Sequence, residues 1–194
     1  MTDRATMVLQ TRDRIVAAAT LLHGERGVLA TSWEEIAQTA GLAPATVYRH
    51  FPSLVELIPA CAKAVFDVSQ PLTLDHAQAK FARLGSPLER FEVLVRESCH
   101  CYGKGEAWLH AARREGDLIP AISEVVRNQE AALEVLVAAC LSDRRVSARA
   151  RRLLFVLCDF PFWKQLSDRG MPRSAIPGTV IDLVRSVLDA EEAS

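Results

Sequence analysis

The 194-residue sequence lacks the features that mark several classes of protein. Its charges nearly cancel, with 23 Lys and Arg against 24 Asp and Glu, which excludes a protein that holds nucleic acid by bulk positive charge. No apolar run approaches the roughly 18 residues that a membrane span needs, and no N-terminal stretch has the pattern of a secretory signal. The five cysteines follow no disulfide or zinc spacing, which is typical of a reducing compartment. We therefore expect a cytoplasmic protein with no membrane partner.

Catalytic and cofactor signatures are lacking as well. We find no Ser/His/Asp spacing, no phosphate-binding loop, no HExxH and no paired-carboxylate motif. Cys99, His100 and Cys101 have the residue types of metal ligands. However, residues two apart on a helix point about 200° apart, so one helix cannot aim both thiols at one ion. The sequence predicts no enzyme, no cofactor and no metal, and it leaves a redox role of Cys99 and Cys101 open beside a buried apolar one.

Strand signals are nearly absent, whereas helical periodicity runs through most of the chain. The pattern predicts an all-α protein with a small N-terminal domain at residues 10–69 and a larger helical domain at residues 70–194. Pro161 lies inside one predicted helix and should kink it. The predicted helices cover residues 11–26, 33–40, 44–50, 53–65, 88–102, 106–114, 119–140, 147–166 and 174–190.

Residues 32–51 have the pattern of a helix-turn-helix. Ser32 and Glu35 form a predicted capping box at the start of the first short helix. Gly41 can take the positive φ of a tight turn, and Pro44 suits the first position of the next helix. A small core would come from Ile36, Ala37, Leu42 and Val47.

The second helix of this pair would present side chains that fit a DNA groove. Arginine can pair with guanine, threonine can contact a thymine methyl, and tyrosine and histidine can reach phosphate oxygens. Helix N-termini at Ser32 and Pro44 would add free amides for phosphates. The candidate DNA-binding residues are Ser32, Ala43, Pro44, Ala45, Thr46, Tyr48, Arg49 and His50.

Several short motifs follow one another in a fixed order between residues 11 and 68. They are Arg14-Ile15-x-x-Ala18-Ala19, Glu25-Arg26-Gly27, Thr31-Ser32, Glu35-Ile36-Ala37-x-x-Ala40-Gly41-Leu42, Thr46-Val47-Tyr48-x-His50-Phe51 and Ser53-x-x-Glu56-Leu57. This stretch resembles the DNA-binding domain of TetR-family regulators. The later Phe160-x-x-Trp163-x-x-Leu166 with Gly170 resembles the dimerisation region of the same family.

The resemblance implies an all-α homodimer with two recognition helices in successive major grooves and a ligand cavity in the second domain. The sequence departs from the family pattern at three positions. His23 replaces a large apolar residue, and Leu54 replaces a lysine that supports phosphate binding. Ala43 replaces the usual Ser or Thr, so the recognition helix lacks a side-chain N-cap worth about 1 kcal/mol.

The second domain offers candidates for a ligand pocket and for a dimer interface. An apolar and aromatic set with two polar anchors fits a cavity, and it fits an ordinary core equally well: Phe66, Phe91, Val95, Cys99, Tyr102 and Trp108, with His110 and Arg113. Two helices should meet their copies in a four-helix interface through Leu153, Leu157, Val180, Leu183, Val184 and Val187. The arginines between 144 and 152 suggest a solvated helix face or a second nucleic-acid site.

Together these patterns predict a sequence-specific transcriptional repressor that a small molecule releases from its operator. Its predicted partners are a double-stranded DNA operator, an unidentified small-molecule effector and a second copy of itself. Two other interpretations stay open. One is a protein that keeps the helix-turn-helix fold but acts through a protein partner, and the other is an enzyme on a helical scaffold.

Overall fold

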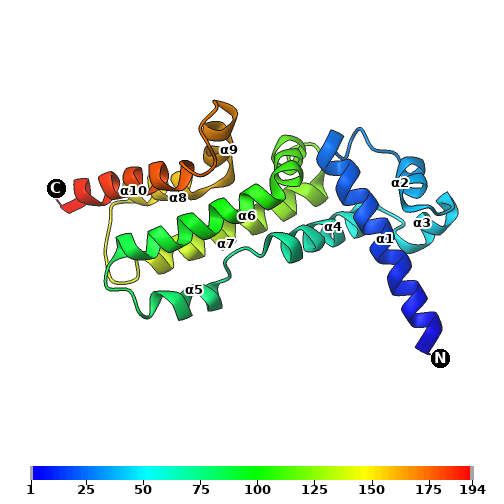
Figure 1. The fold of residues 1–194 in the computed structure, drawn as a ribbon, viewed down its shortest axis with the longest axis horizontal. Coiled ribbons are helices and arrows are strands. Elements are labelled where there is room, and N and C mark those ends of the chain that lie inside the picture. The colour runs from blue at the N-terminus through cyan, green and yellow to red at the C-terminus, as the bar shows by residue number, and fades with distance from the viewer. Residues whose placement is uncertain (1, 193–194) are drawn as a thin grey trace. The chain divides into compact units, whose positions relative to one another are not determined.

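The computed structural model describes residues 2–192, and over this range it contains ten α-helices and no strand (Figure 1). The predicted all-α fold is confirmed. No helix of this range is long and apolar enough to cross a membrane. The helices are α1 (Thr2–Arg26), α2 (Trp33–Ala40), α3 (Pro44–His50), α4 (Leu54–Ser69), α5 (Leu74–Phe81), α6 (Pro87–Glu115), α7 (Pro120–Cys140), α8 (Ala148–Cys158), α9 (Phe160–Asp168) and α10 (Ile176–Glu192).

The chain forms two compact units. One runs up to Val68 and includes Gly105–Arg127, and the other contains Ser69–Lys104 and the chain from Asn128 onward. The first unit therefore holds α1 to α4 together with the end of α6 and the start of α7. The division into functional domains at residues 69 and 70 remains a prediction.

The first unit is built on apolar faces that recur at helical spacing. In α1, residues 15, 18, 19 and 22 share one buried face, as the i, i+3, i+4, i+7 pattern requires. This face packs on α2, which in turn packs on α3. The other fully buried side chains of α2 to α4 include Ile36, Ala37, Val47, Phe51, Leu57, Ile58 and Cys61.

The last residue of α6 holds the loop between α1 and α2. The Glu115 side chain is buried, and its Oε2 accepts hydrogen bonds from the backbone amides of Val28, at 2.7 Å, and Leu29, at 3.1 Å. Gly27 has φ +97°, and a Cβ at this position would lie 1.9 Å from Glu115 Oε1. The loop conformation therefore depends on a glycine and on a carboxylate that is distant in the sequence.

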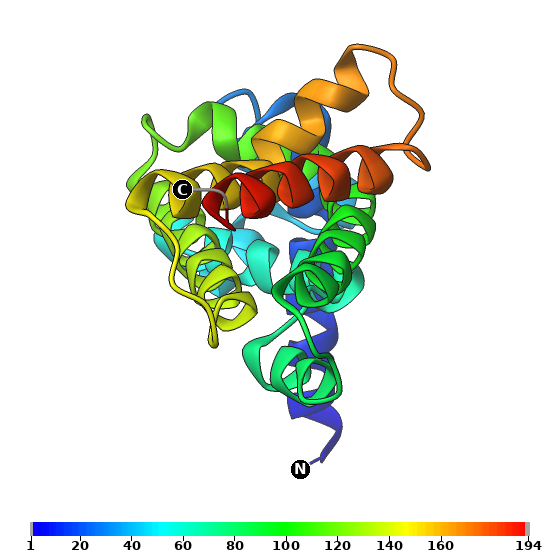
Figure 2. The same ribbon diagram turned by 90° about the vertical axis from the view of Figure 1, so that its left-hand side faces the viewer.

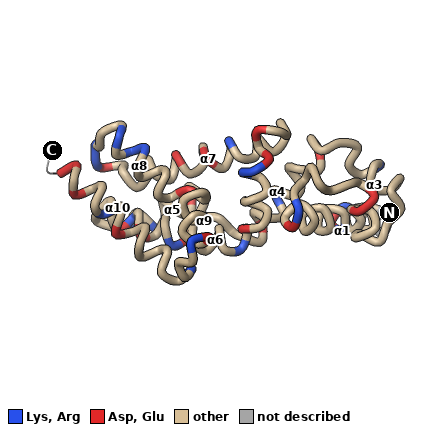
Figure 3. Tube along the Cα trace, turned by 90° about the horizontal axis from the view of Figure 1, so that it is seen from above, with Lys and Arg blue, Asp and Glu red and all other residues tan. Residues whose placement is uncertain are grey.

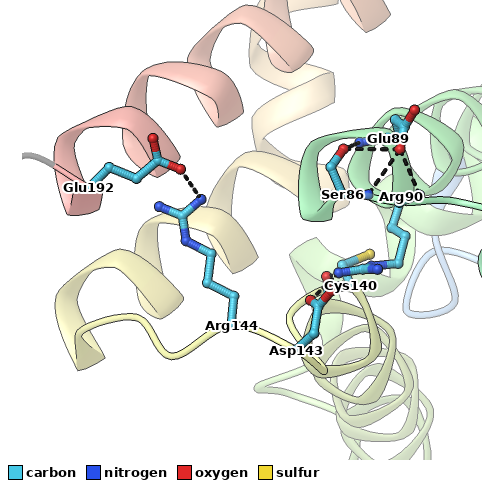
Figure 4. Close-up of polar contacts among 8 residues, drawn as sticks. Ser86, Glu89, Arg90, Cys140, Asp143, Arg144 and Glu192 are labelled. Atoms are coloured by element: carbon cyan, nitrogen blue, oxygen red, sulfur yellow. Dashed lines mark hydrogen bonds and ion pairs between the residues drawn. The ribbon is translucent and has the colours of Figure 1, made fainter.

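In the second unit, α8 and α10 pack side by side (Figures 1 and 2). Buried side chains of α10 recur at residues 176, 180, 181, 184 and 188, which is the spacing of one helix face. Arg90 of α6 is buried, and its Nε donates to the carbonyl oxygen of Cys140 at 2.9 Å while its guanidinium pairs with Asp143 (Figure 4). Ser86 and Glu89 form a reciprocal capping box at the start of the same helix.

Four predictions about the helices were wrong. The first helix begins at Thr2, and its residues 5–10 are exposed, so they have no buried face that periodicity could reveal. Helix α5 was missed, although Thr73 caps it by accepting from the amide of His76. Residues 88–114 lie in one continuous α6, and Gly105 does not break it. A Cβ at Gly105 would lie 3.2 Å from the Val65 side chain, so this glycine serves close helix packing.

The predicted helix over residues 147–166 is two helices. Helix α8 ends at Cys158, and Asp159 takes an extended conformation between α8 and α9. Pro161 lies in the first turn of α9, where its missing N–H costs no hydrogen bond. The proline therefore starts a helix and does not kink one.

Candidate nucleic-acid interface

Helix α2 begins with the predicted capping box. Ser32 Oγ accepts from the amide of Glu35 at 3.2 Å, and Glu35 Oε2 accepts from the amide of Ser32 at 2.8 Å. Hydrogen bonds from the backbone and side chain of Ser32 hold the pKa of Glu35 below its usual value. The carboxylate therefore stays ionised at the helix N-terminus, where the helix dipole favours a negative charge.

The turn between α2 and α3 depends on Gly41, which has φ 64°. Its amide and that of Leu42 donate to carbonyls of the last turn of α2. Arg14 Nη2 donates to the carbonyl oxygens of Ala40, at 2.6 Å, and Gly41, at 3.1 Å. A Cβ on residue 41 would lie 3.0 Å from this guanidinium, so glycine serves both the turn and the approach of Arg14.

Helix α3 has one buried face and one exposed face. Val47 is fully buried, whereas Ala45, Tyr48 and Arg49 are exposed. Ala43 makes no side-chain cap, as expected from its methyl group, and its carbonyl accepts from the amide of Thr46 at 2.9 Å. Of the remaining candidates, Ser32, Pro44 and Ala43 are exposed, and Thr46 and His50 are half-buried.

Arginines near this helix pair are largely engaged within the chain. Arg12 Nη1 donates to the His50 carbonyl oxygen at 2.8 Å, and its guanidinium lies 4.1 Å from the centroid of the Phe51 ring. Arg26 pairs with Glu35 at 2.6 Å. Arg49 is exposed and has no hydrogen bond within the part of the chain that the structure describes. It is therefore the arginine of α3 that can offer its full set of donors to a partner.

Helix α3 also carries the exposed Tyr48 and the half-buried His50. The Tyr48 ring lies 5.3 Å from the Trp33 ring, centroid to centroid, so the tyrosine is positioned against α2. Burial lowers the pKa of His50, and the neighbouring Arg49 and Arg12 charges lower it further. We therefore expect a neutral imidazole at pH 7, which can donate or accept a hydrogen bond without adding charge.

The candidate pocket residues fall into both units. Phe66, Trp108, His110 and Arg113 belong to the first unit, where Trp108 is buried and Phe66 and His110 are exposed. Phe91, Val95, Cys99 and Tyr102 belong to the second unit. There the Tyr102 hydroxyl donates to the Cys158 carbonyl oxygen at 2.8 Å. Its ring contacts Phe160 and Trp163 edge to face, with centroids 5.6 and 6.1 Å away.

The candidate dimer residues divide by burial. Val180 and Val184 are buried within the protomer's own second unit, so they are core residues. Leu153 and Leu183 are 43% and 38% exposed, and Leu157 and Val187 are half-buried. These four line a surface groove of about 440 Å³ between α8 and α10, together with Arg149, Ala150, Ser186, Ala190 and Glu191.

Sequence reasoning missed three residues that position the helix pair. Arg12 and Arg14 cap the C-terminal ends of α3 and α2, and Glu115 fixes the loop that precedes α2. The two arginines lie two positions apart in α1, and a basic residue is a known partner for the carbonyls of a helix end. Glu115 gave no local signal, because its partners are 86 and 87 residues away.

Comparisons with known proteins agree with this geometry. Residues 15–61 match the family model of bacterial regulatory proteins of the tetR family. The HTH-type transcriptional regulator BetI of Rhizobium meliloti (strain 1021) is 33% identical over 87 residues, which is 45% of this chain. The match spans 41% of the length of that curated relative.

Solved structures resemble the fold over nearly the whole chain. A tetR-family transcriptional regulator from Streptomyces coelicolor has a TM-score of 0.72 at 19% identity, covering 94% of this chain and 82% of its own. A transcriptional regulator from Saccharomonospora viridis in complex with choline has a TM-score of 0.65 at 20% identity, covering 90% and 95%. The fold, the helix-turn-helix geometry and the matched motif agree, and residues 15–61 are a helix-turn-helix domain of the tetR family of bacterial regulatory proteins, within a chain that has the fold of solved regulators of that family.

Proposed function

We propose that this protein is a dimeric transcriptional repressor that reads an operator with α3 and leaves it when a small molecule binds. The observation that carries the proposal is the two-faced recognition helix. Val47 anchors α3 in the core, and Tyr48 and Arg49 are exposed. The family model covers these residues.

The two exposed side chains have different roles in this proposal. Arg49 reads a base, because a guanidinium can donate two hydrogen bonds to guanine in the major groove. Tyr48 contacts a phosphate with its hydroxyl and is held in place by Trp33. Phosphate contacts position the helix, and base contacts give sequence preference.

An operator with two half-sites requires two recognition helices and therefore two copies of the chain. Two recognition helices must lie about 34–36 Å apart to enter successive major grooves. We assign the interface to the exposed residues of the α8–α10 groove, and leave out Val180 and Val184 because they are core residues. A groove floored by leucine and valine gains stability when a second copy removes it from water.

Support for control by an effector comes from a similar solved structure. The Saccharomonospora viridis relative holds choline, which supports a small-molecule effector for this chain. An effector releases the operator when it binds the non-binding conformation more tightly than the binding one. Choline is the first probe: an effector should raise the melting temperature and weaken operator binding.

An electrophoretic mobility shift at low salt, on the chain's own promoter DNA, tests the proposal. Arg49→Ala should lose about 1–3 kcal/mol per half-site on the preferred sequence, and less on unrelated DNA. Tyr48→Ala should weaken binding to all sequences equally. Arg151→Ala removes an exposed arginine of α8 and serves as the matched control. Unchanged affinity in both α3 variants would contradict the proposal, and binding to a protein partner without any DNA shift would favour the alternative function.

A further inference from the structure

The outer face of α8 carries a stripe of basic and apolar side chains. Arg149, Arg152, Leu153 and Val156 follow one another at i, i+3, i+4 and i+7, so they share one side of the helix, and all four are exposed. Val156 is 52% exposed, which is high for a valine. Helix α8 contains three arginines and no acidic residue, as the blue segments along it in Figure 3 show.

The outer face of α10 has the opposite charge at its edge. Leu183, Ser186, Val187 and Ala190 line the groove. Asp182 and Asp189 are seven positions apart and both exposed, so by helix geometry they share the side of α10 that lies opposite the buried Val184. Across the surface, the order is therefore a basic edge on α8, the apolar groove, and an acidic edge on α10.

Other charges near the groove are engaged within the protomer. Arg144 Nη1 pairs with Glu192 at 2.9 Å (Figure 4). The Glu191 carboxylate accepts from the amide of Ser147 at 2.6 Å and from its hydroxyl at 2.7 Å. Asp182 also pairs with Arg185 of the next turn, at 2.9 Å, but both side chains remain accessible. The two edges are thus the charges that a partner on this face would meet.

We infer that the second copy docks with the basic edge of its α8 on the acidic edge of the first copy's α10, and the reverse. This inference rests on the proposed dimer and fixes its geometry. A twofold axis that lies in the contact plane along the groove brings each basic edge onto an acidic edge. An axis across the groove would bring basic onto basic and acidic onto acidic, which electrostatic repulsion opposes.

Two charge-reversed variants of the full chain test the pairing. The first is Arg149→Glu with Arg152→Glu, and the second is Asp182→Lys with Asp189→Lys. Each variant alone should place like charges on both edges and weaken self-association by about tenfold or more. Mixed in equal amounts, the two variants restore opposite charges at both edges. The mixture should therefore form a heterodimer, seen by native mass spectrometry, that is tighter than either homodimer.

Controls separate pairing from folding and from net charge. Arg151→Glu on α8 and Asp75→Lys on α5 make single charge reversals at exposed positions away from the stripe, and they should leave self-association unchanged. Circular dichroism should show wild-type helicity in all variants. Because the edges are exposed, added salt should weaken the wild-type dimer.

The outcomes distinguish this inference from the proposed function. Wild-type dimers with no heterodimer in the mixture, or a tighter homodimer of the first variant, would overturn the edge pairing and leave the repressor dimer standing. A wild-type chain that sediments as a monomer at micromolar concentration would overturn the dimer as well.

Discussion

Arginine has different partners in the helix-turn-helix region and on α8. Arg12 and Arg14 donate hydrogen bonds to carbonyls at the ends of α3 and α2, so their charge stabilises the fold. Arg149 and Arg152 are exposed on the outer face of α8. The number of arginines in the sequence therefore does not predict how many are accessible near the helix-turn-helix or on α8. The helix pair has fewer accessible arginine donors than its sequence suggests, whereas the arginines on the outer face of α8 are accessible.

The largest loss of stability is expected when the helix-turn-helix region loses an internal partner, Glu115. Glu115→Ala leaves the buried amide of Val28 without its acceptor and opens a space beside Gly27. We expect a loss of about 2–4 kcal/mol in the free energy of unfolding, measured with urea. Glu115→Gln keeps an acceptor oxygen and should lose less. Equal losses in the two variants would mean that the hydrogen bonds contribute little.

Acidification tests the same region through His23. Its side chain is buried with both ring nitrogens unpaired, and burial lowers its pKa from 6.5 to about 4, although Glu115 acts in the opposite direction. Between these values the unfolded chain binds a proton that the folded chain does not. Stability should therefore fall by about 3 kcal/mol as pH decreases from 6.5 to 4.

A matched variant isolates the histidine from the neighbouring carboxylate. Burial raises the pKa of Glu115, but hydrogen bonds from Arg114, Leu29 and Val28 outweigh it and leave the pKa below 4.5. The contribution of Glu115 is thus present above pH 4.5 and is lost as pH falls through its lower folded value. His23→Leu should flatten the stability curve between pH 6.5 and 4.5. An unchanged slope in that variant would show that other groups titrate there.

Substituting one arginine near the helix-turn-helix and one on α8 with alanine should give different losses of stability. Arg14→Ala removes two hydrogen bonds at the end of α2 and should cost about 1.5–3 kcal/mol of protomer stability. Arg152→Ala should change protomer stability by less than about 0.5 kcal/mol, as is usual for an exposed side chain. Thermal unfolding of both variants under conditions that keep the chain monomeric makes the measurement. Similar costs would remove the distinction between the two sets.

The smallest effects concern the start of the recognition helix. Ala43→Ser should supply the missing N-cap and stabilise the first unit by about 1 kcal/mol. Leu54→Lys places a charge at the first residue of α4, where the half-buried leucine now lies. If this helix end approaches the operator, the salt dependence of binding should steepen by about one unit per subunit. Lower stability without a steeper dependence would show that Leu54 is needed as a packing residue.

Local patterns account for what could be predicted from the sequence. The capping box of Ser32 and Glu35, the turn at Gly41 and the buried face of α1 each involve residues within a few positions of one another. Features set by distant contacts could not be predicted in this way. Residues 102 and 106, which were predicted to lie in separate helices, belong to one continuous α6, in which Gly105 packs close to Val65. Val184, a predicted interface residue, is buried within its own protomer.

Selection of binding sites from random duplex DNA tests the central claim most directly, namely that α3 reads an operator through Arg49. The wild-type protein and Arg49→Ala are each used to enrich bound sequences at low salt. We expect the wild type to select a twofold-symmetric site whose half-sites lie one helical turn apart, or a multiple of it. Arg49→Ala should select the same site with the preference lost at one position of each half. Enrichment of no sequence by the wild type, or of an identical sequence by both proteins, would contradict the account.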